Sequence, residues 1–218
     1  MSSGSIRCVY LHGFASGPSS AKARFFRERL AARGIACDVV DLAPDFERTT
    51  VSDQLARALA AIGTSPCVLI GSSLGGYLAS LAAAGPAVAQ VEKLLLLAPA
   101  FRLHERWRER MSRAEQEQWE REGVLLFDHH VTRRKEPLRH EFLVDAARHA
   151  PLPPVTQPVL AFAGEHDDLV PPSVVREFCD AAPRRELVLV DDGHELTRSL
   201  ESIWSRAEPW LTASGSTG

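Results

Sequence analysis

Apolar residues in this chain gather in short continuous runs, separated by stretches in which they recur every three or four positions. Short apolar runs bounded by glycine, proline or polar residues are typical of buried strands. We expect strands at residues 6–11, 37–42, 67–70, 91–97, 158–164 and 185–190. The run at 91–97 is too continuously apolar to face water, so we expect it in the middle of a parallel sheet.

Helical periodicity fills most of the intervals between these runs. We expect helices at residues 20–33, 51–62, 74–84, 173–181 and 196–210. Alternating strands and helices indicate an α/β fold, with a mostly parallel central sheet and helices on both faces. We interpret residues 1–218 as a single domain and expect the small, polar segment 212–218 to be a flexible tail.

The alternation is interrupted after Phe101. Residues 102–151 are rich in arginine and glutamate and carry two tryptophans. Leu103, Trp107 and Met111 mark one helical stripe in this segment. We interpret the segment as a small helical lid over the strand ends, with Trp107 and Met111 as candidate substrate contacts. The alternative is a packed excursion that touches no substrate.

Within this insertion, local signals mark further elements. Ser112 and Glu115 have the spacing of a capping box that begins a helix, and Gly123 suits the end of that helix. Residues 124–127 read as a short strand, and Pro137 suits the start of another helix.

Composition excludes several function classes. The 218 residues are 45% apolar and carry a formal net charge of −3, which suits a globular domain with a sizeable core and gives no sign of a nucleic-acid partner. No apolar run is long enough to cross a bilayer, and the first residues lack the basic and apolar parts of a signal peptide. We therefore expect a cytoplasmic protein without a membrane partner.

The four cysteines, Cys8, Cys37, Cys67 and Cys179, are scattered singly without a CxxC pair. We interpret them as reduced thiols and expect no metal site.

The stretch after the third apolar run carries the most specific chemical signal. Gly71, Ser73 and Gly75 have the GxSxG spacing of a nucleophile elbow, a sharp strand-to-helix turn in which side chains beside the serine would collide with backbone. Only Ser73 fits, because Ser72 would need a glycine where the chain has Ile70. The alternative is that the two glycines merely form a tight connection.

A second loop follows the first expected strand. Residues 12–18 begin His-Gly-Phe, and a loop in this position can direct a backbone N–H toward the nucleophile. We assign two oxyanion-hole donors to the N–H groups of Phe14 and Leu74. His12 is a candidate substrate contact, although holding the loop by hydrogen bonds suits it better. The alternative is that the loop is only a turn.

An acid and a base candidate follow the last two strands. Asp167 and Asp168 come just after residue 164, and Asp167 is preferred because the turn should aim it inward. His194 lies directly after the last strand and can exchange a proton near neutral pH. The alternatives are that the aspartates cap the next helix and that the histidine is a surface cap.

The order of these signals is serine, aspartate, histidine, which is the order found in α/β hydrolases. From Ile6 to Leu211 the chain resembles the α/β-hydrolase superfamily. The stretches Tyr-Leu-His-Gly-Phe at 10–14 and Ile-Gly-Ser-Ser-Leu-Gly-Gly-Tyr at 70–77 resemble the small bacterial YqiA/YcfP-type esterases. The resemblance implies ester hydrolysis by a triad of Ser73, Asp167 and His194. The arginine-rich insertion at 102–151 departs from that resemblance, because it is bulkier than in compact members of the group, and the departure bears on substrate preference more than on the chemistry.

We therefore expect a serine hydrolase that cleaves small carboxylic esters through an acyl-enzyme, with no cofactor. A thioesterase or acyltransferase could use the same residues, and a noncatalytic binding module could keep the same fold. The natural substrate and the oligomeric state stay open.

Overall fold

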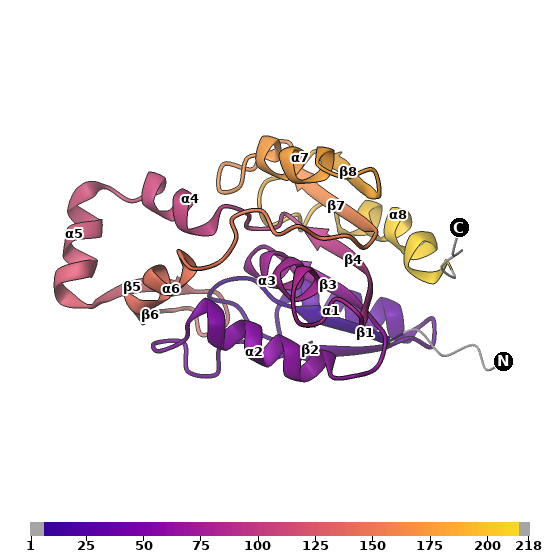
Figure 1. The fold of residues 1–218 in the computed structure, drawn as a ribbon, viewed down its shortest axis with the longest axis horizontal. Helices are drawn as coiled ribbons and strands as arrows, with labels where there is room; N and C mark the ends of the chain where they lie inside the picture. The colour runs from indigo at the N-terminus through magenta and orange to yellow at the C-terminus, as the bar shows by residue number, and fades with distance from the viewer. Residues whose placement is uncertain (1–6, 214–218) are drawn as a thin grey trace.

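Six parallel strands form the central sheet of the protein, whose computed structural model describes residues 7–213. The strand order is β2-β1-β3-β4-β7-β8 (Figure 1). The strand bounds are β1 Arg7–Leu11, β2 Ala36–Val40, β3 Cys67–Ser72, β4 Val91–Leu97, β7 Val159–Gly164 and β8 Arg185–Val190. Each of the apolar runs thus forms a strand, although Ile6 lies outside the described residues. The α/β fold with a parallel sheet is confirmed.

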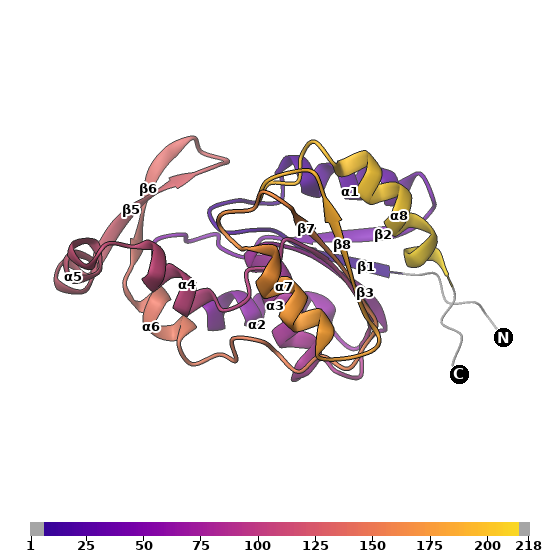
Figure 2. The ribbon, with the colours of Figure 1, turned by 90° about the horizontal axis from the view of Figure 1, so that it is seen from above.

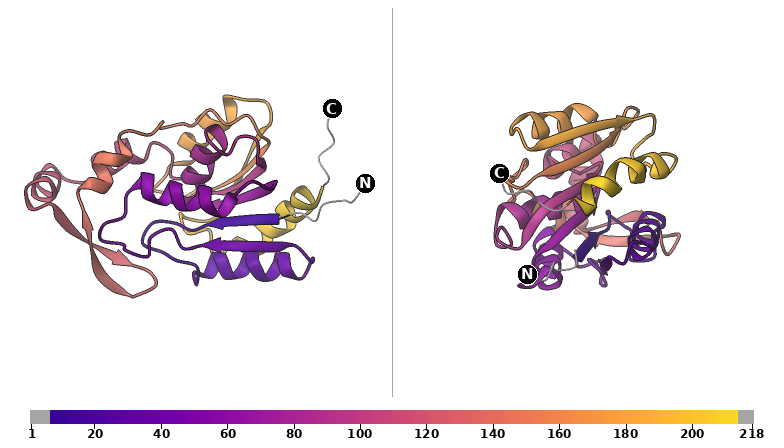
Figure 3. Two further views of the ribbon diagram at one scale, coloured as in Figure 1. Left: turned by 60° about the horizontal axis from the view of Figure 1, so that its bottom comes forward. Right: turned by 90° about the vertical axis from the view of Figure 1, so that its right-hand side faces the viewer.

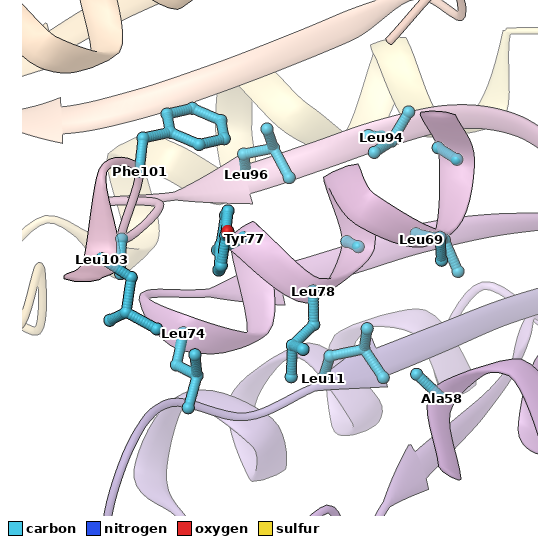
Figure 4. Packing of buried hydrophobic residues seen from close by; sticks show 14 of the residues in the cluster. Leu11, Ala58, Leu69, Leu74, Tyr77, Leu78, Leu94, Leu96, Phe101 and Leu103 are labelled. Atoms are coloured by element: carbon cyan, nitrogen blue, oxygen red, sulfur yellow. The ribbon is translucent and has the colours of Figure 1, made fainter. Parts of the chain in front are cut away.

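Helices cover both faces of this sheet. One face carries α1 (Ala21–Ala31) and α8 (Leu200–Thr212). The other carries α2 (Val51–Ile62), α3 (Leu74–Ala84) and α7 (Pro172–Asp180) (Figure 2). Because successive side chains of a strand point to opposite faces, each strand contributes to two hydrophobic cores. Leu11 and Leu69 pack on the α3 side beside Leu78 (Figure 4), whereas Tyr10 packs on the α1 side.

The insertion between β4 and β7 extends beyond the carboxyl ends of the strands (Figure 3, left). It consists of α4 (Leu103–Arg110), α5 (Arg113–Glu122), β5 (Val124–His129), β6 (Arg134–Arg139) and α6 (Glu141–Ala146). Its two ends meet, because the Arg102 N–H donates to the carbonyl of Pro151 over 2.9 Å. The insertion therefore starts and ends at neighbouring points, and β7, which is parallel to β4, begins only at Val159.

Most of this insertion agrees with the expectation, including the strand expected at 124–127, which is β5, but β6 differs from it. The capping box of Ser112 and Glu115 begins α5, and Gly123 ends that helix at φ 73°, as predicted. Pro137, however, lies within β6 opposite Leu126 and does not open a helix. The strands β5 and β6 form an isolated antiparallel pair, and a proline without an N–H is tolerated on such an edge.

The last helix begins later than its apolar pattern indicates. Leu196 is buried but has φ 54°, and α8 begins at Leu200. The cause is the Asp192 carboxylate, which accepts the N–H groups of Arg198 and Ser199 and holds the chain in a loop before the helix. At the other end, α8 includes Thr212, and residues 214–218 of the expected flexible tail lie outside the described residues.

Over residues 7–213, none of the helices combines the length and the apolar character that a bilayer span requires.

Candidate active site

Ser73 lies in the turn between β3 and α3 and has a strained backbone. Its φ of 52° and ψ of −117° fall outside the regions that non-glycine residues favour. Its N–H donates to the carbonyl of Leu97 over 2.8 Å, so the neighbouring strand holds the turn in place. A Cβ at Gly71 would lie 2.5 Å from the carbonyl oxygen of Gly75. The two glycines of the elbow are therefore required by close backbone contact.

Gly75 is packed even more closely, and its replacement is expected to destabilise the protein. A Cβ at this position would lie 2.1 Å from the carbonyl oxygen of Leu11, which is backbone and cannot move aside. Gly75→Ala should lower the free energy of unfolding by about 3 kcal/mol and the melting temperature by roughly 6–12 °C. Thermal unfolding measures the change. Gly17→Ala is the control, because its Cβ would meet Val131 at an ordinary 3.5 Å. Equal melting temperatures for the two variants would contradict the prediction.

The structure brings Ser73, His194 and Asp167 into one hydrogen-bonded chain. The Ser73 hydroxyl is 2.9 Å from Nε2 of His194, and Nδ1 of His194 is 2.8 Å from Oδ2 of Asp167. The Asp167 side chain is fully shielded from solvent, and that of His194 is 10% exposed. In this geometry a histidine can accept a hydroxyl proton on one nitrogen while the carboxylate fixes the other.

The turn after β7 decides between the two candidate acids. Oδ1 of Asp167 accepts the N–H groups of Leu169 and Val170 over 2.9 and 2.8 Å, which leaves Oδ2 for the histidine. Asp168 is exposed, and its backbone carbonyl accepts a hydrogen bond from Arg110. The structure therefore brings Asp167, and not Asp168, to His194.

The loop that carries His194 depends on a residue that the sequence analysis missed. Asp192 is buried, and its carboxylate accepts the N–H of Gly193 over 2.8 Å in addition to the two N–H groups before α8. Burial acts to raise the pKa of Asp192, but these hydrogen bonds outweigh it and hold that pKa below its usual value. An aspartate directly before a glycine was a signal for such a turn.

Gly164, at the end of β7, lets the loop that carries His194 (the histidine loop) approach the turn that carries Asp167 (the acid turn). A Cβ there would lie 2.4 Å from the carbonyl oxygen of Asp192. The acid turn and the histidine loop are therefore in direct backbone contact.

Phe14 and Leu74 lie beside Ser73 on the wall of the same cavity. Among the described residues, no acceptor pairs with the backbone N–H of Phe14, and Leu74 is the first residue of α3, whose N–H has no partner within the helix. The ring of Phe14 packs edge-on against Trp107 and Phe127, with ring centres 5.0 and 5.5 Å apart. The insertion thus helps to hold the loop that carries Phe14.

His12 does not line the cavity, which corrects its assignment as a candidate substrate contact. It is 2% exposed, and its Nδ1–H donates to the carbonyl of Gly13 over 2.9 Å. Its Nε2 accepts the N–H of Leu42 over 3.2 Å, and burial lowers the pKa of His12. A neutral ring therefore fastens the loop to the segment after β2, which is the supporting role that also fitted the sequence.

The cavity has a volume of about 810 Å³ and opens at the carboxyl ends of the strands. Ser73 and His194 line it, together with Trp107 and Met111 from the insertion. Across residues 7–213, no group of three or more histidine, cysteine, aspartate or glutamate side chains is placed to hold a metal ion.

Comparison with solved structures finds the same fold in several proteins. α/β-Hydrolase domain-containing protein 10 from mouse is 21% identical, with a TM-score of 0.79 over 94% of this chain and 89% of that chain. Est1E from Butyrivibrio proteoclasticus is 20% identical, with a TM-score of 0.74 over 96% and 89% of the two chains. The monoacylglycerol lipase of Paleococcus ferrophilus is 14% identical, with a TM-score of 0.75 over 94% and 93%.

No curated protein matches this sequence closely enough to count as a relative. A family model does match residues 7–205, and its description is Uncharacterised protein family (UPF0227). That match covers the strands, the insertion and the three residues of the hydrogen-bonded chain. The chain therefore belongs to the UPF0227 family, and its fold is that of the α/β-hydrolase superfamily.

Proposed function

We propose that this protein is a serine hydrolase that cleaves carboxylic esters, with Ser73 as nucleophile, His194 as base and Asp167 as the residue that orients the base. The observation that carries the proposal is the hydrogen-bonded chain of these side chains on the wall of a cavity. The fold supports it, since Est1E has the same fold and one of its structures holds ferulic acid.

In the first half of the reaction, Nε2 of His194 takes the proton of the Ser73 hydroxyl while Oγ attacks the ester carbonyl. The N–H groups of Phe14 and Leu74 bind the oxyanion of the tetrahedral intermediate. Asp167 stabilises the imidazolium through Nδ1. The histidine then gives the proton to the leaving alkoxide, and the acyl group stays on Ser73.

In the second half, water takes the place of the alcohol. His194 accepts a proton from this water as it attacks the acyl-enzyme, and returns the proton to Ser73 Oγ when the acid leaves. Trp107 and Met111 are proposed to contact the acyl chain, because both line the cavity and Trp107 packs edge-on against the ring of Phe14.

Labelling with a fluorophosphonate probe tests this proposal directly. The probe phosphonylates activated serines, so we expect one adduct at Ser73, located by peptide mass spectrometry. Failure to label, or labelling elsewhere, would contradict the assignment and favour a noncatalytic binding role. Rates with an ester, a thioester of the same acid and an added alcohol acceptor then separate an esterase from a thioesterase or an acyltransferase.

Treatment with a thiol-alkylating reagent should leave ester hydrolysis unchanged. Burial raises the pKa of Cys8 and of Cys37 to about 12 and that of Cys179 to about 11, and it also raises the pKa of Cys67. These thiols stay protonated at neutral pH and are poor nucleophiles. The measurement is the residual rate after treatment with iodoacetamide at pH 7. A loss of activity that follows the extent of alkylation would point to a cysteine in the reaction.

We also propose a cytoplasmic location, because four free thiols suit a reducing compartment. Cell fractionation with an antibody tests it.

A further inference from the structure

The two sides of the cavity differ in chemistry. On one side, Phe14, Leu74, Phe101 and Trp107 belong to, or pack against, the hydrophobic core under α3. On the other side, the lining comes from the loop before α1, the first turn of α1, the turn between β5 and β6, and the residues after His194. This second side is polar and carries Lys22, Arg24 and Arg133.

Positive charge at this cavity is local. The protein as a whole has a formal net charge of −3. Its cavity is nevertheless lined by five lysine and arginine side chains and a single carboxylate, that of Glu195; the cations are Lys22, Arg24, Arg106, Arg110 and Arg133. A cavity with this imbalance attracts anions.

Three of the five cations already have partners. Lys22 donates to the carbonyl of Glu195 over 2.8 Å and pairs with its carboxylate over 3.3 Å. Arg106 and Arg110 donate to the carbonyls of Leu169 and Asp168 in the acid turn, over 3.1 and 2.6 Å. These contacts brace the cavity wall.

Arg24 and Arg133 are the remaining pair. Both are exposed, and within residues 7–213 neither forms an ion pair with a carboxylate. Both lie next to the loop between β1 and α1. Arg24 lies in α1, directly after this loop. Arg133 lies in the turn between β5 and β6, which is bonded to the loop because the His130 N–H donates to the carbonyl of Ala15 over 2.8 Å. Two arginines that line one cavity can bind a phosphate or a carboxylate.

The proposed mechanism determines which part of the substrate lies near Arg24 and Arg133. The leaving oxygen takes its proton from Nε2 of His194, so the leaving group lies on the histidine side of Ser73. Glu195 and Thr197, which follow His194, line the polar side, and Glu195 is bonded to Lys22 in the first turn of α1. The acyl group, held beside Phe14, lies on the apolar side.

We propose that the substrate is an ester between an apolar acid and an alcohol that carries an anionic group, a phosphate or a carboxylate, and that Arg24 and Arg133 bind this group. The proposal rests on the proposed ester hydrolysis at Ser73. It narrows the substrate class by assigning the charge to the leaving group.

Three butyrate esters test the proposal: 3-methylphenyl butyrate, 3-(carboxymethyl)phenyl butyrate and 3-(phosphonomethyl)phenyl butyrate. In both anionic esters a methylene group separates the charge from the ring, so the leaving groups have similar reactivity. We expect kcat/KM to be about tenfold higher for an anionic ester than for the neutral one, through a lower KM. Whichever anionic ester has the higher kcat/KM shows whether the site recognises a phosphate-like group or a carboxylate. Equal kcat/KM for all three esters overturns the proposal.

Variants assign the preference to the two arginines. Arg24→Gln with Arg133→Gln should bring the ratio of anionic to neutral kcat/KM close to one, and Arg24→Lys should retain part of it. Arg27→Gln is the matched control, because Arg27 is exposed on the same helix and does not line the cavity, and it should leave the ratio unchanged. A ratio that survives in the double variant overturns the arginine assignment.

A binding measurement separates this proposal from the proposed hydrolysis. Calorimetric titration of 3-(phosphonomethyl)phenol and 3-(carboxymethyl)phenol into Ser73→Ala protein needs no catalysis. Binding of one of them that weakens about tenfold when both arginines are replaced supports the anion site, even if no ester is cleaved. The absence of binding, together with cleavage of the neutral ester, overturns the anion site and leaves ester hydrolysis standing.

Discussion

Ser73→Ala is expected to reduce the turnover of p-nitrophenyl acetate by about three to six orders of magnitude. The variant keeps the fold and the proposed oxyanion donors but loses the oxygen that is proposed to attack the carbonyl. Only the weak background reaction within the cavity remains. Steady-state release of p-nitrophenol measures the loss, and burst kinetics of the unaltered protein would show the acyl-enzyme directly.

The neighbouring serine offers a matched control for this substitution. The Ser72 hydroxyl is buried next to the elbow and finds no hydrogen-bond partner among the described residues, whereas the Ser73 hydroxyl meets His194. Ser72→Ala should therefore change turnover by less than about tenfold. If Ser73→Ala hydrolyses the ester at nearly the parent rate, Ser73 is not the nucleophile.

Asp167→Asn is expected to lower kcat by about 10⁴-fold while the protein stays folded. An amide can donate a hydrogen bond to Nδ1, which favours the tautomer with a proton on Nε2 and removes the acceptor that Ser73 needs. The side chain still fits, because the change replaces one oxygen by nitrogen. Turnover and circular dichroism, measured on the same sample, separate loss of catalysis from loss of structure.

Asp168→Asn is the control for this experiment. It makes the same chemical change one residue further along the chain, where the side chain is exposed and does not contact His194. We expect kcat to stay within a factor of about two to three. Equal losses in the two variants would mean that the charge of the turn matters and that the contact with His194 does not.

The elements that position Ser73 could be predicted because their signals are local. A tight strand-to-helix turn needs Gly71 and Gly75 at fixed spacing, and the structure shows the backbone contacts that impose this need. The approach of Asp167 and His194 followed from a property of parallel sheets, whose strands end at one edge.

The strand around Pro137 and the buried position of His12 could not be predicted, because they depend on contacts between segments that are distant in the sequence. Pro137 pairs with Leu126 because α5 and the hairpin fold around the buried Trp119, whose indole N–H donates to the carbonyl of Leu138 over 2.9 Å. The residues around Pro137 alone do not reveal that they pair with another strand. His12 faces Leu42 for the same reason, since the segment after β2 returns beside the end of β1.

The hydrogen bond from the Arg102 N–H to the carbonyl of Pro151 bears on how related proteins can diversify. Because the insertion starts and ends at neighbouring points, another segment could replace it without moving the strand ends that precede Ser73, Asp167 and His194. The constraint on a replacement is an aromatic surface that still supports Phe14. Chimaeras that exchange this segment between family members are therefore expected to fold with Ser73, His194 and Asp167 in place and, under the proposed function, to differ in the substrates that they accept.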